Sequence, residues 1–455
     1  MAAYSKSLKP SSVLKANCYE IGHTWQPSCI RAILDILLGG IVESVKIYAP
    51  VYVITGLARR RSKRYWLHKF VPELLQSAVF LGSNAGAFIG SFCLLNQLFE
   101  RFSYCTGLAS GAMASQLAIL LERKPRRGML AVYMFNVALE TLSNMAISRG
   151  LITPRKHIEV LLFSITAAGY AYLFRCFGGL SGVFLQGVRF LLGTEEAGKP
   201  GDARSLESEA NRPAVQSAQH SAWKQNLSVS RIMRLLKAAL VQRHALCMHK
   251  HSCAMYCLKG FGRMFGIGYA AQAVLRVLSS LQTIIKSPSR LLSCIFNKNN
   301  INLGAFLGGF VGIFKFVSCF LRWLRDQDSD LHALPAGFLA GLCMFFYPSW
   351  TIALYLTLKL GELLYMKGIE AGHLPCITHA DSLLFAVSTA VVLHAAVMEP
   401  HNVKPSYWTF LQRLTRQRFG MMNRRVLDVY GTHASKLMPD FKPQLDPKFC
   451  LMKHE

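Results

Sequence analysis

The pentapeptide GAFIG at residues 86–90 returns as GAFLG at residues 304–308. The glycines around both copies are spaced by four residues: Gly82, Gly86 and Gly90, then Gly304, Gly308 and Gly312. Glycines at this spacing form a ridge along one face of a helix. In lipid no hydrophobic force draws helices together, so close backbone packing over such ridges supplies much of the attraction. The pattern predicts two equivalent membrane helices that pack through glycine, or alternatively the wall of a lateral opening or pore.

Other matches between the two halves of the chain keep the same order. LLFSITA at residues 161–167 matches LLFAVST at residues 383–389, and the same offset relates Glu140 to Glu362. We therefore predict a tandem duplication of residues from about 30 to 175 and from about 258 to 398, because stacked like units bury a continuous interface between helices.

The composition requires a membrane environment. Hydrophobic residues make up 52% of the chain and charged residues only 16%, which is too apolar for a soluble protein of this length. The net charge of +27 is concentrated in short runs beside apolar segments and near the C-terminus. Such runs are typical of loops that face the cytosol or anionic lipids. Since no nucleic-acid-binding motif accompanies them, we expect membrane lipids, and no nucleic acid, as partners.

Each repeat contains four apolar segments long enough to approach the thickness of a bilayer. They are residues 75–98, 106–121, 128–147 and 158–174, then 303–324, 331–346, 350–366 and 382–398. A charged lead-in segment precedes each set, and it either spans the membrane or lies in the interface. With four spans per repeat, the basic runs all lie on one side of the membrane, as the positive-inside rule requires. With five spans per repeat, the two copies would have opposite orientations in the membrane, as in many transporters. We expect an all-α polytopic membrane protein, two tandem repeats of a four- to five-helix bundle with about 8–10 spans.

Composition shifts divide the chain into six segments. They are an N-terminal Cys/His-containing segment (1–30), the first membrane repeat with a trailing amphipathic helix (31–192), a flexible linker (193–228), a basic amphipathic helix with a Cys/His-rich segment (229–257), the second membrane repeat (258–398) and a basic C-terminal tail (399–455). The linker is rich in Gly, Ser, Glu, Ala and Pro without periodicity, which is typical of a flexible chain.

Two carboxylates occupy equivalent positions within apolar spans, Glu140 and Glu362. An ionised group in hydrocarbon is costly unless it is paired or faces water, which makes both residues candidates for handling a substrate or ion. Lys359 precedes Glu362 by three residues and can pair with it on one helix face, while Asn136 can only donate a hydrogen bond to Glu140. The alternative is a structural pair whose side chains reach the headgroups.

A group of cysteines and histidines precedes the second lead-in segment: Cys247, His249, His251, Cys253 and Cys257. Cys18, His23 and Cys29 stand in the same place before the first repeat. Thiolates and imidazoles this close together can bind zinc tetrahedrally, although the spacing matches no established zinc finger and a plain loop is the alternative.

The cysteines are scattered along the chain, and their spacing predicts no disulfide framework. Cys93, Cys319 and Cys343 lie within apolar segments, where we expect the thiol to act as a small hydrophobic group.

Enzymatic motifs are missing from the sequence. It has no phosphate-binding glycine loop, no Gly-x-Ser-x-Gly elbow and no His-Glu-x-x-His motif. His379 and Asp381 are not accompanied by a nucleophile. We expect no catalytic residues, no enzymatic activity and no cofactor.

Several segments together resemble the transmembrane protein 135 family, also called peroxisomal membrane protein 52, over essentially the whole chain. They are NCYEIGHTW (17–25), KIYAP (46–50), PSRLL (288–292), KGIEAG (367–372), PSYW (405–408) and MNRRVLDV (422–429). The linker departs from the family pattern. The glycine-spaced repeat unit also distantly resembles the channel subunits of mitochondrial inner-membrane protein translocases.

The first resemblance implies a multi-pass protein of peroxisomal and mitochondrial membranes that acts in mitochondrial fission–fusion balance, peroxisome organisation and lipid and cholesterol handling. It implies the organelle-division machinery and the import receptor for peroxisomal membrane proteins as partners. The residues themselves leave a second function open, a multi-span transporter or channel for a lipid or another metabolite, with Glu140 and Glu362 along its path.

Overall fold

The computed structural model describes residues 13–153, 156–176, 178–180, 182–197, 242–280, 283–284, 287 and 289–451. These residues form helices and connecting segments, and their only β-type pairing is an isolated bridge between Leu14 and Phe102. The all-α polytopic fold predicted from the sequence is confirmed. Most of the linker and the basic helix expected before residue 243 lie outside the described residues.

The helices form two compact units. Unit 1 comprises Met1–Pro154 and Gly372–Glu455, and unit 2 comprises Arg155–Ala371. The α-helices of unit 1 are α1 (Cys18–Ile21), α2 (Cys29–Ala58), α3 (Lys63–His68), α4 (Phe70–Phe99), α5 (Thr106–Leu121), α6 (Lys124–Ser148), α18 (Ala380–Met398), α19 (Pro405–Leu414) and α20 (Arg424–Leu427). Among the described residues of unit 2, the α-helices are α7 (Ile158–Arg175), α8 (Gly182–Leu192), α12 (Cys253–Ser279), α14 (Arg290–Ile295), α15 (Asn300–Arg325), α16 (Ala333–Gly341) and α17 (Trp350–Glu370).

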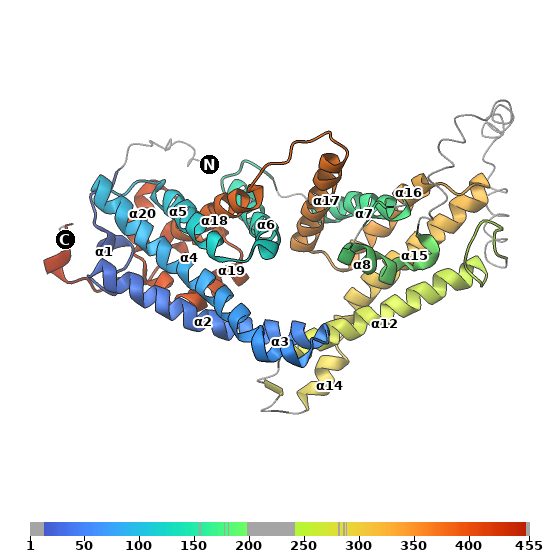
Figure 1. Cartoon of the computed structure of the whole chain (residues 1–455), viewed down its shortest axis with the longest axis horizontal. Coiled ribbons are helices and arrows are strands. Elements are labelled where there is room, and N and C mark those ends of the chain that lie inside the picture. The colour runs from blue at the N-terminus through green and yellow to red at the C-terminus, as the bar shows by residue number, and fades with distance from the viewer. Residues whose placement is uncertain are drawn as a thin grey trace, which may run out of the picture. The chain divides into compact units, whose positions relative to one another are not determined.

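The last helix of each predicted repeat packs in the unit that holds the rest of the other repeat. Helix α7 packs against α16 and α17, and α18 packs against α5 and α6 (Figure 1). Small residues permit this packing, because a Cβ at Gly111 would lie 2.9 Å from the Cα atom of Ala390 in α18. A Cβ at Gly337 would lie 2.8 Å from the Cα atom of Ala168 in α7. The compact units therefore do not follow the boundaries predicted from the repeats.

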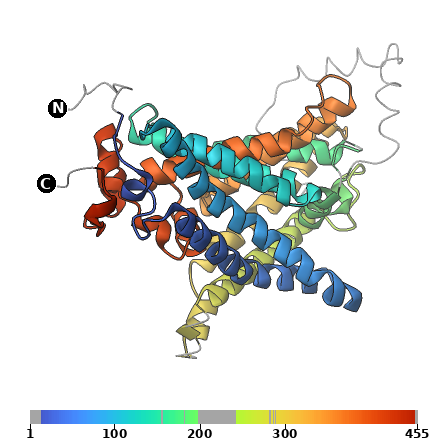
Figure 2. The same ribbon diagram turned by 60° about the vertical axis from the view of Figure 1, so that its left-hand side comes forward.

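The six spaced glycines all face the lead-in helix of their own repeat. In unit 1 a Cβ at Gly82 would lie 2.8 Å from the backbone nitrogen of Ile41 in α2. In unit 2 a Cβ at Gly308 would lie 3.0 Å from the carbonyl oxygen of Phe261 in α12. Figures 1 and 2 show α2 running alongside α4. Each lead-in helix thus forms an antiparallel pair with the first strong span, at the close approach that glycine allows.

Five of the described helical stretches are long and apolar enough to cross a membrane. They are α4, α6, α7, the stretch Arg290–Arg325 and α18. Two further apolar stretches, α5 and Asp330–Phe346, are shorter. Helix α17 has the length but carries Lys359, Glu362, Lys367 and Glu370. The chain is a multi-pass membrane protein, and the count of about 8–10 spans stays a prediction.

The segment after α18 is folded into unit 1. Leu411, Leu414, Phe419 and Met422 are buried in the same core as residues of α4 and α18. This segment is therefore part of the core of unit 1, although the sequence predicts a basic tail.

Replacing Gly337 by alanine is expected to destabilise unit 2 by about 1–3 kcal/mol, because the added methyl group would press α16 away from the backbone of α7. Thermal unfolding of the detergent-solubilised chain measures the change. Gly361→Ala is the matched control, since a Cβ there meets nothing within 4 Å. An equal effect of both substitutions would contradict the packing of α7 against α16.

Candidate functional site

The first candidate site is a cluster of four cysteine and histidine side chains in unit 1, called cluster 1. Its members are Cys18, His23, Cys29 and Cys93, whose ligand atoms all lie within 4.8 Å of one another. The Sγ atoms of Cys18 and Cys29 are 3.4 Å apart. Three short pieces of chain supply these groups: α1 with the turn after it, the first residue of α2, and the C-terminal half of α4.

Local hydrogen bonds hold cluster 1 in place. Asn17 caps α1 by accepting from the backbone N–H of Glu20 at 2.8 Å, and the Glu20 carboxylate accepts from the backbone N–H of Asn17 at 2.7 Å. This reciprocal arrangement fixes the start of a very short helix. Nδ1 of His23 lies 2.7 Å from the carbonyl oxygen of Gln26 and therefore carries the proton. Its Nε2 atom is buried without a hydrogen-bond partner in the described part of the chain, and it is left as an acceptor or ligand.

The second candidate site, cluster 2, has the same composition and lies in unit 2. Its members are Cys247, His249, Cys253 and Cys319, all buried, with ligand atoms within 4.8 Å of one another. The Sγ atom of Cys319 is 3.9 Å from that of Cys247 and 3.5 Å from Nε2 of His249. Nδ1 of His249 lies 2.7 Å from the carbonyl oxygen of His251, so this histidine too is held with Nε2 facing the thiols.

The two clusters are built from corresponding parts of the two predicted repeats. In each, a cysteine and a histidine precede the lead-in helix, a cysteine is its first residue, and a cysteine from the following span completes the set. Of the residues predicted for a metal, the structure brings together Cys247, His249 and Cys253. His251 contributes its backbone carbonyl instead of its ring, and Cys257 is not among the four converging groups.

Cys93 and Cys319 are the two members that were expected from the sequence to act only as small hydrophobic groups. The register that aligns Gly86 with Gly304 places Cys93 opposite Val311, whereas Cys319 is the residue that takes the place of Cys93 in cluster 2. Because the glycines recur every four residues, about one helical turn, the two repeats can be aligned in several ways that differ by whole turns. The glycines alone therefore do not define the alignment of the two repeats. The offset that relates His23 to His249 also relates Cys93 to Cys319, so an alignment anchored on the two histidines matches these cysteines.

Thiol–thiol hydrogen bonds favour the ionised form in both clusters. A hydrogen bond from Cys93 lowers the pKa of the Cys18 thiol to about 4, against the opposing effect of burial. A hydrogen bond from Cys319 lowers the pKa of the Cys247 thiol to about 7, and the nearby Arg322 adds to this shift. Since the thiolate is the form that binds metals, both clusters contain a cysteine prepared for coordination.

Cluster 2 adjoins a buried ion network. The guanidinium of Arg322 donates to both carboxylate oxygens of Glu196, at 3.2 and 2.7 Å, and to Asp328 at 3.0 Å. Arg175 also pairs with Asp328, at 2.5 Å. The Nη1 atom of Arg322 lies 3.9 Å from the Sγ atom of Cys247, which places a positive charge beside the thiols.

The two carboxylates singled out from the sequence form ion pairs within their own units. Lys404 donates to Glu140 at 3.2 Å in unit 1, and Lys359 donates to Glu362 at 2.5 Å in unit 2. The pairing of Lys359 with Glu362 is the one expected from their spacing. The amide oxygen of Asn136, in contrast, has no hydrogen-bond partner in the described part of the chain.

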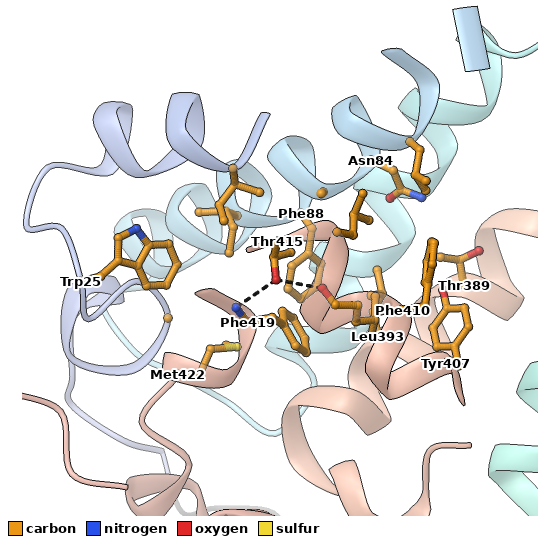
Figure 3. A pocket seen from close by; sticks show the side chains of 17 residues that line it. Trp25, Asn84, Phe88, Thr389, Leu393, Tyr407, Phe410, Thr415, Phe419 and Met422 are labelled. Atoms are coloured by element: carbon orange, nitrogen blue, oxygen red, sulfur yellow. Dashed lines mark hydrogen bonds between the residues drawn. The ribbon is translucent and has the colours of Figure 1, made fainter. Parts of the chain in front are cut away.

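Unit 1 also contains an apolar pocket between α2, α4, α18 and the C-terminal segment (Figure 3). Trp25, Phe88 and Phe419 line it, and Thr415 holds the adjoining turn by accepting from the backbone N–H of Phe419 at 3.1 Å. The cavity volume is about 40 Å³, which accommodates a few water-sized groups but no lipid molecule.

The helical spans and the paired Cys/His clusters define a multi-pass membrane protein with a cysteine-rich N-terminal region. Residues 15–147 match the family described as the N-terminal cysteine-rich region of Transmembrane protein 135. This region of the chain is therefore similar to the corresponding region of transmembrane protein 135. The matched residues include all four members of cluster 1. No solved structure matches the chain.

Proposed function

We propose that this chain is a multi-pass protein of peroxisomal and mitochondrial membranes that binds other proteins and has no enzymatic activity. In this role it supports mitochondrial fission–fusion balance, peroxisome organisation and lipid and cholesterol handling. The organelle-division machinery and the import receptor for peroxisomal membrane proteins are the proposed partners. The match of residues 15–147 to the N-terminal cysteine-rich region of Transmembrane protein 135 supports the proposal.

The observation that carries the proposal is a folded body outside the candidate spans, formed by residues 13–28 and 399–451 and called the basic platform. Its two segments are joined by hydrogen bonds: Thr24 donates to the carbonyl of Met421 at 2.6 Å, and the backbone N–H of Asn423 donates to the carbonyl of Ile21 at 2.9 Å. A defined shape of this kind can present its basic side chains in a fixed arrangement to an acidic partner surface.

Charge reversal tests the proposal without disturbing the core. Arg413, Lys436 and Lys442 are exposed on the basic platform. Changing all three to Glu is expected to abolish co-purification of partner proteins and to alter organelle shape in cells, at an unchanged protein level. Deletion of everything after Met398 is a poorer experiment, since it would also remove buried core residues.

The matched control reverses three exposed basic residues of unit 2, Lys259, Arg290 and Lys298. It changes the net charge by the same amount and should leave partner binding intact. Normal partner binding and organelle shape in the platform variant would overturn the proposal.

A second candidate function is transport of a lipid or another metabolite. The side chain of Glu362 is 39% exposed on α17 although it is paired with Lys359, so it is accessible from outside the unit. If transport depends on the carboxylates, changing Glu140 and Glu362 together to Gln should lower the flux at least about tenfold, since each would lose its charge in a low-dielectric setting. The protein-binding proposal expects unchanged flux in reconstituted vesicles and in cells.

A further inference from the structure

The spacing of the donor atoms in both clusters fits a single tetrahedral ion. With metal–sulfur bonds of about 2.3 Å and a metal–nitrogen bond of about 2.0–2.1 Å, tetrahedral zinc separates two sulfurs by about 3.8 Å and a sulfur from the nitrogen by about 3.6 Å. The structure has sulfur–sulfur distances of 3.4 Å in cluster 1 and 3.9 Å in cluster 2. In cluster 2 the sulfur–nitrogen distance is 3.5 Å.

The histidines are oriented as metal ligands usually are. A ligating imidazole commonly donates its other N–H to a backbone carbonyl or a carboxylate, which fixes the ring and the tautomer. His23 and His249 each place Nδ1 at 2.7 Å from a backbone carbonyl two or three residues further along the chain. The Nε2 atom of His23 is buried and without a partner in the described residues, at a cost that a metal ion would remove.

The donor set also selects the class of metal. Three thiolates and one imidazole form one of the common structural zinc sites. Because all four donor atoms of each cluster lie within 4.8 Å of one another, the space between them holds one ion and not an iron–sulfur cluster. Four protein ligands fill the coordination sphere of zinc, so that no position is left for a reacting water.

We propose that each unit of this protein holds one structural Zn²⁺ ion, bound by Cys18, His23, Cys29 and Cys93 in unit 1 and by Cys247, His249, Cys253 and Cys319 in unit 2. Each ion ties the segment before a lead-in helix to the far end of the adjacent span. In each unit, metal coordination thus stabilises one end of the antiparallel helix pair, and close packing over glycine stabilises its middle. The proposal goes beyond the proposed function and does not depend on it.

The positive charge of Arg322 would stabilise a zinc ion bound at cluster 2. Zn²⁺ bound by three thiolates and one neutral imidazole leaves the site with one net negative charge. The guanidinium of Arg322, 3.9 Å from the Sγ atom of Cys247, offsets this charge within the buried interior.

Elemental analysis of the full-length chain tests the proposal. The protein is produced with zinc in the medium and purified in detergent with a reducing agent and without chelator. We expect about two zinc ions per chain, one per Cys₃His set. Cys93→Ser and Cys319→Ser should each lower the content to about one, and the double variant to none. Cys343→Ser removes a buried thiol outside both clusters and should leave the zinc content unchanged.

The unchanged protein provides a test that needs no folded variant. Titration with an organomercurial should release zinc in step with the loss of three thiols per ion. Exchange with Co²⁺ should produce the visible bands and the thiolate charge-transfer band of a tetrahedral site. A zinc content well below one per chain, full zinc content in the double variant, or stoichiometric iron or copper in place of zinc would each overturn the proposal.

Discussion

A His249→Ala chain is expected to lose the order of residues 243–260 and to unfold at a markedly lower temperature than the unchanged chain. His249 is buried in cluster 2 and stacks on Tyr256 with ring centroids 4.3 Å apart. Structural zinc contributes about 10–16 kcal/mol to the folding of zinc-finger peptides at neutral pH, so loss of one ligand removes a large share of local stability. Hydrogen–deuterium exchange and thermal unfolding in detergent measure the effect.

His251→Ala is the matched control for this prediction. The ring of His251 is exposed and only its backbone carbonyl contacts His249, so alanine preserves that contact. We expect normal exchange and normal zinc content. Treatment of the unchanged chain with a strong chelator should reproduce the His249→Ala behaviour in residues 243–260 and extend it to residues 17–29. Equal effects of the two histidine substitutions would contradict a metal role for His249.

Replacing Arg322 by methionine is expected to destabilise unit 2 by about 3–5 kcal/mol, because it leaves the buried carboxylate of Glu196 without its main partner. Arg322 is 2% exposed and Glu196 3% exposed, so water cannot compensate for the lost pair. The shift in the midpoint of thermal unfolding in detergent measures the loss. The same substitution should weaken zinc binding at cluster 2 by about 10–100-fold, the usual effect of removing a group that supports the ligands.

A second substitution separates the lost charge pair from lost packing. Adding Glu196→Gln to Arg322→Met removes the uncompensated charge and should restore more than half of the stability. Arg325→Met, on an exposed side chain of the same helix, should change stability by less than about 1 kcal/mol. If the double variant is no more stable than Arg322→Met alone, the ion pair does not account for the effect.

Patterns of local periodicity made the membrane class, the helical content and most helix positions predictable. The apolar segment expected at residues 382–398 is observed as α18, and that at 158–174 as α7. The pairing of Lys359 with Glu362 followed from their spacing on one helix face. Three of the four members of cluster 2 could be found from sequence, because they lie within seven residues of one another.

The partners of α7 and α18 could not be predicted. Small side chains on α5, α16 and both of these helices make several pairings equally compatible with the repeat pattern, and the backbone approaches at Gly111 and Gly337 select one of them. The packing of α18 against α6 also brings Lys404, more than two hundred positions away, to Glu140. The pairing of Glu140 with Lys404 therefore could not be predicted either, and only the helical neighbour Asn136 was apparent from the sequence.

By itself the sequence determined that this chain is a bundle of membrane helices, since hydrophobicity acts over a few helical turns and can be recognised along the chain. The tandem duplication stays a prediction from the repeated glycine spacing. Only the tertiary structure decided which helices share a unit and that Cys93 and Cys319 complete the two clusters. A thiol within an apolar span looks like any small hydrophobic group until folding brings it against an imidazole and two further thiols. Metal coordination depends on that convergence in space, to which residues far apart in the sequence contribute.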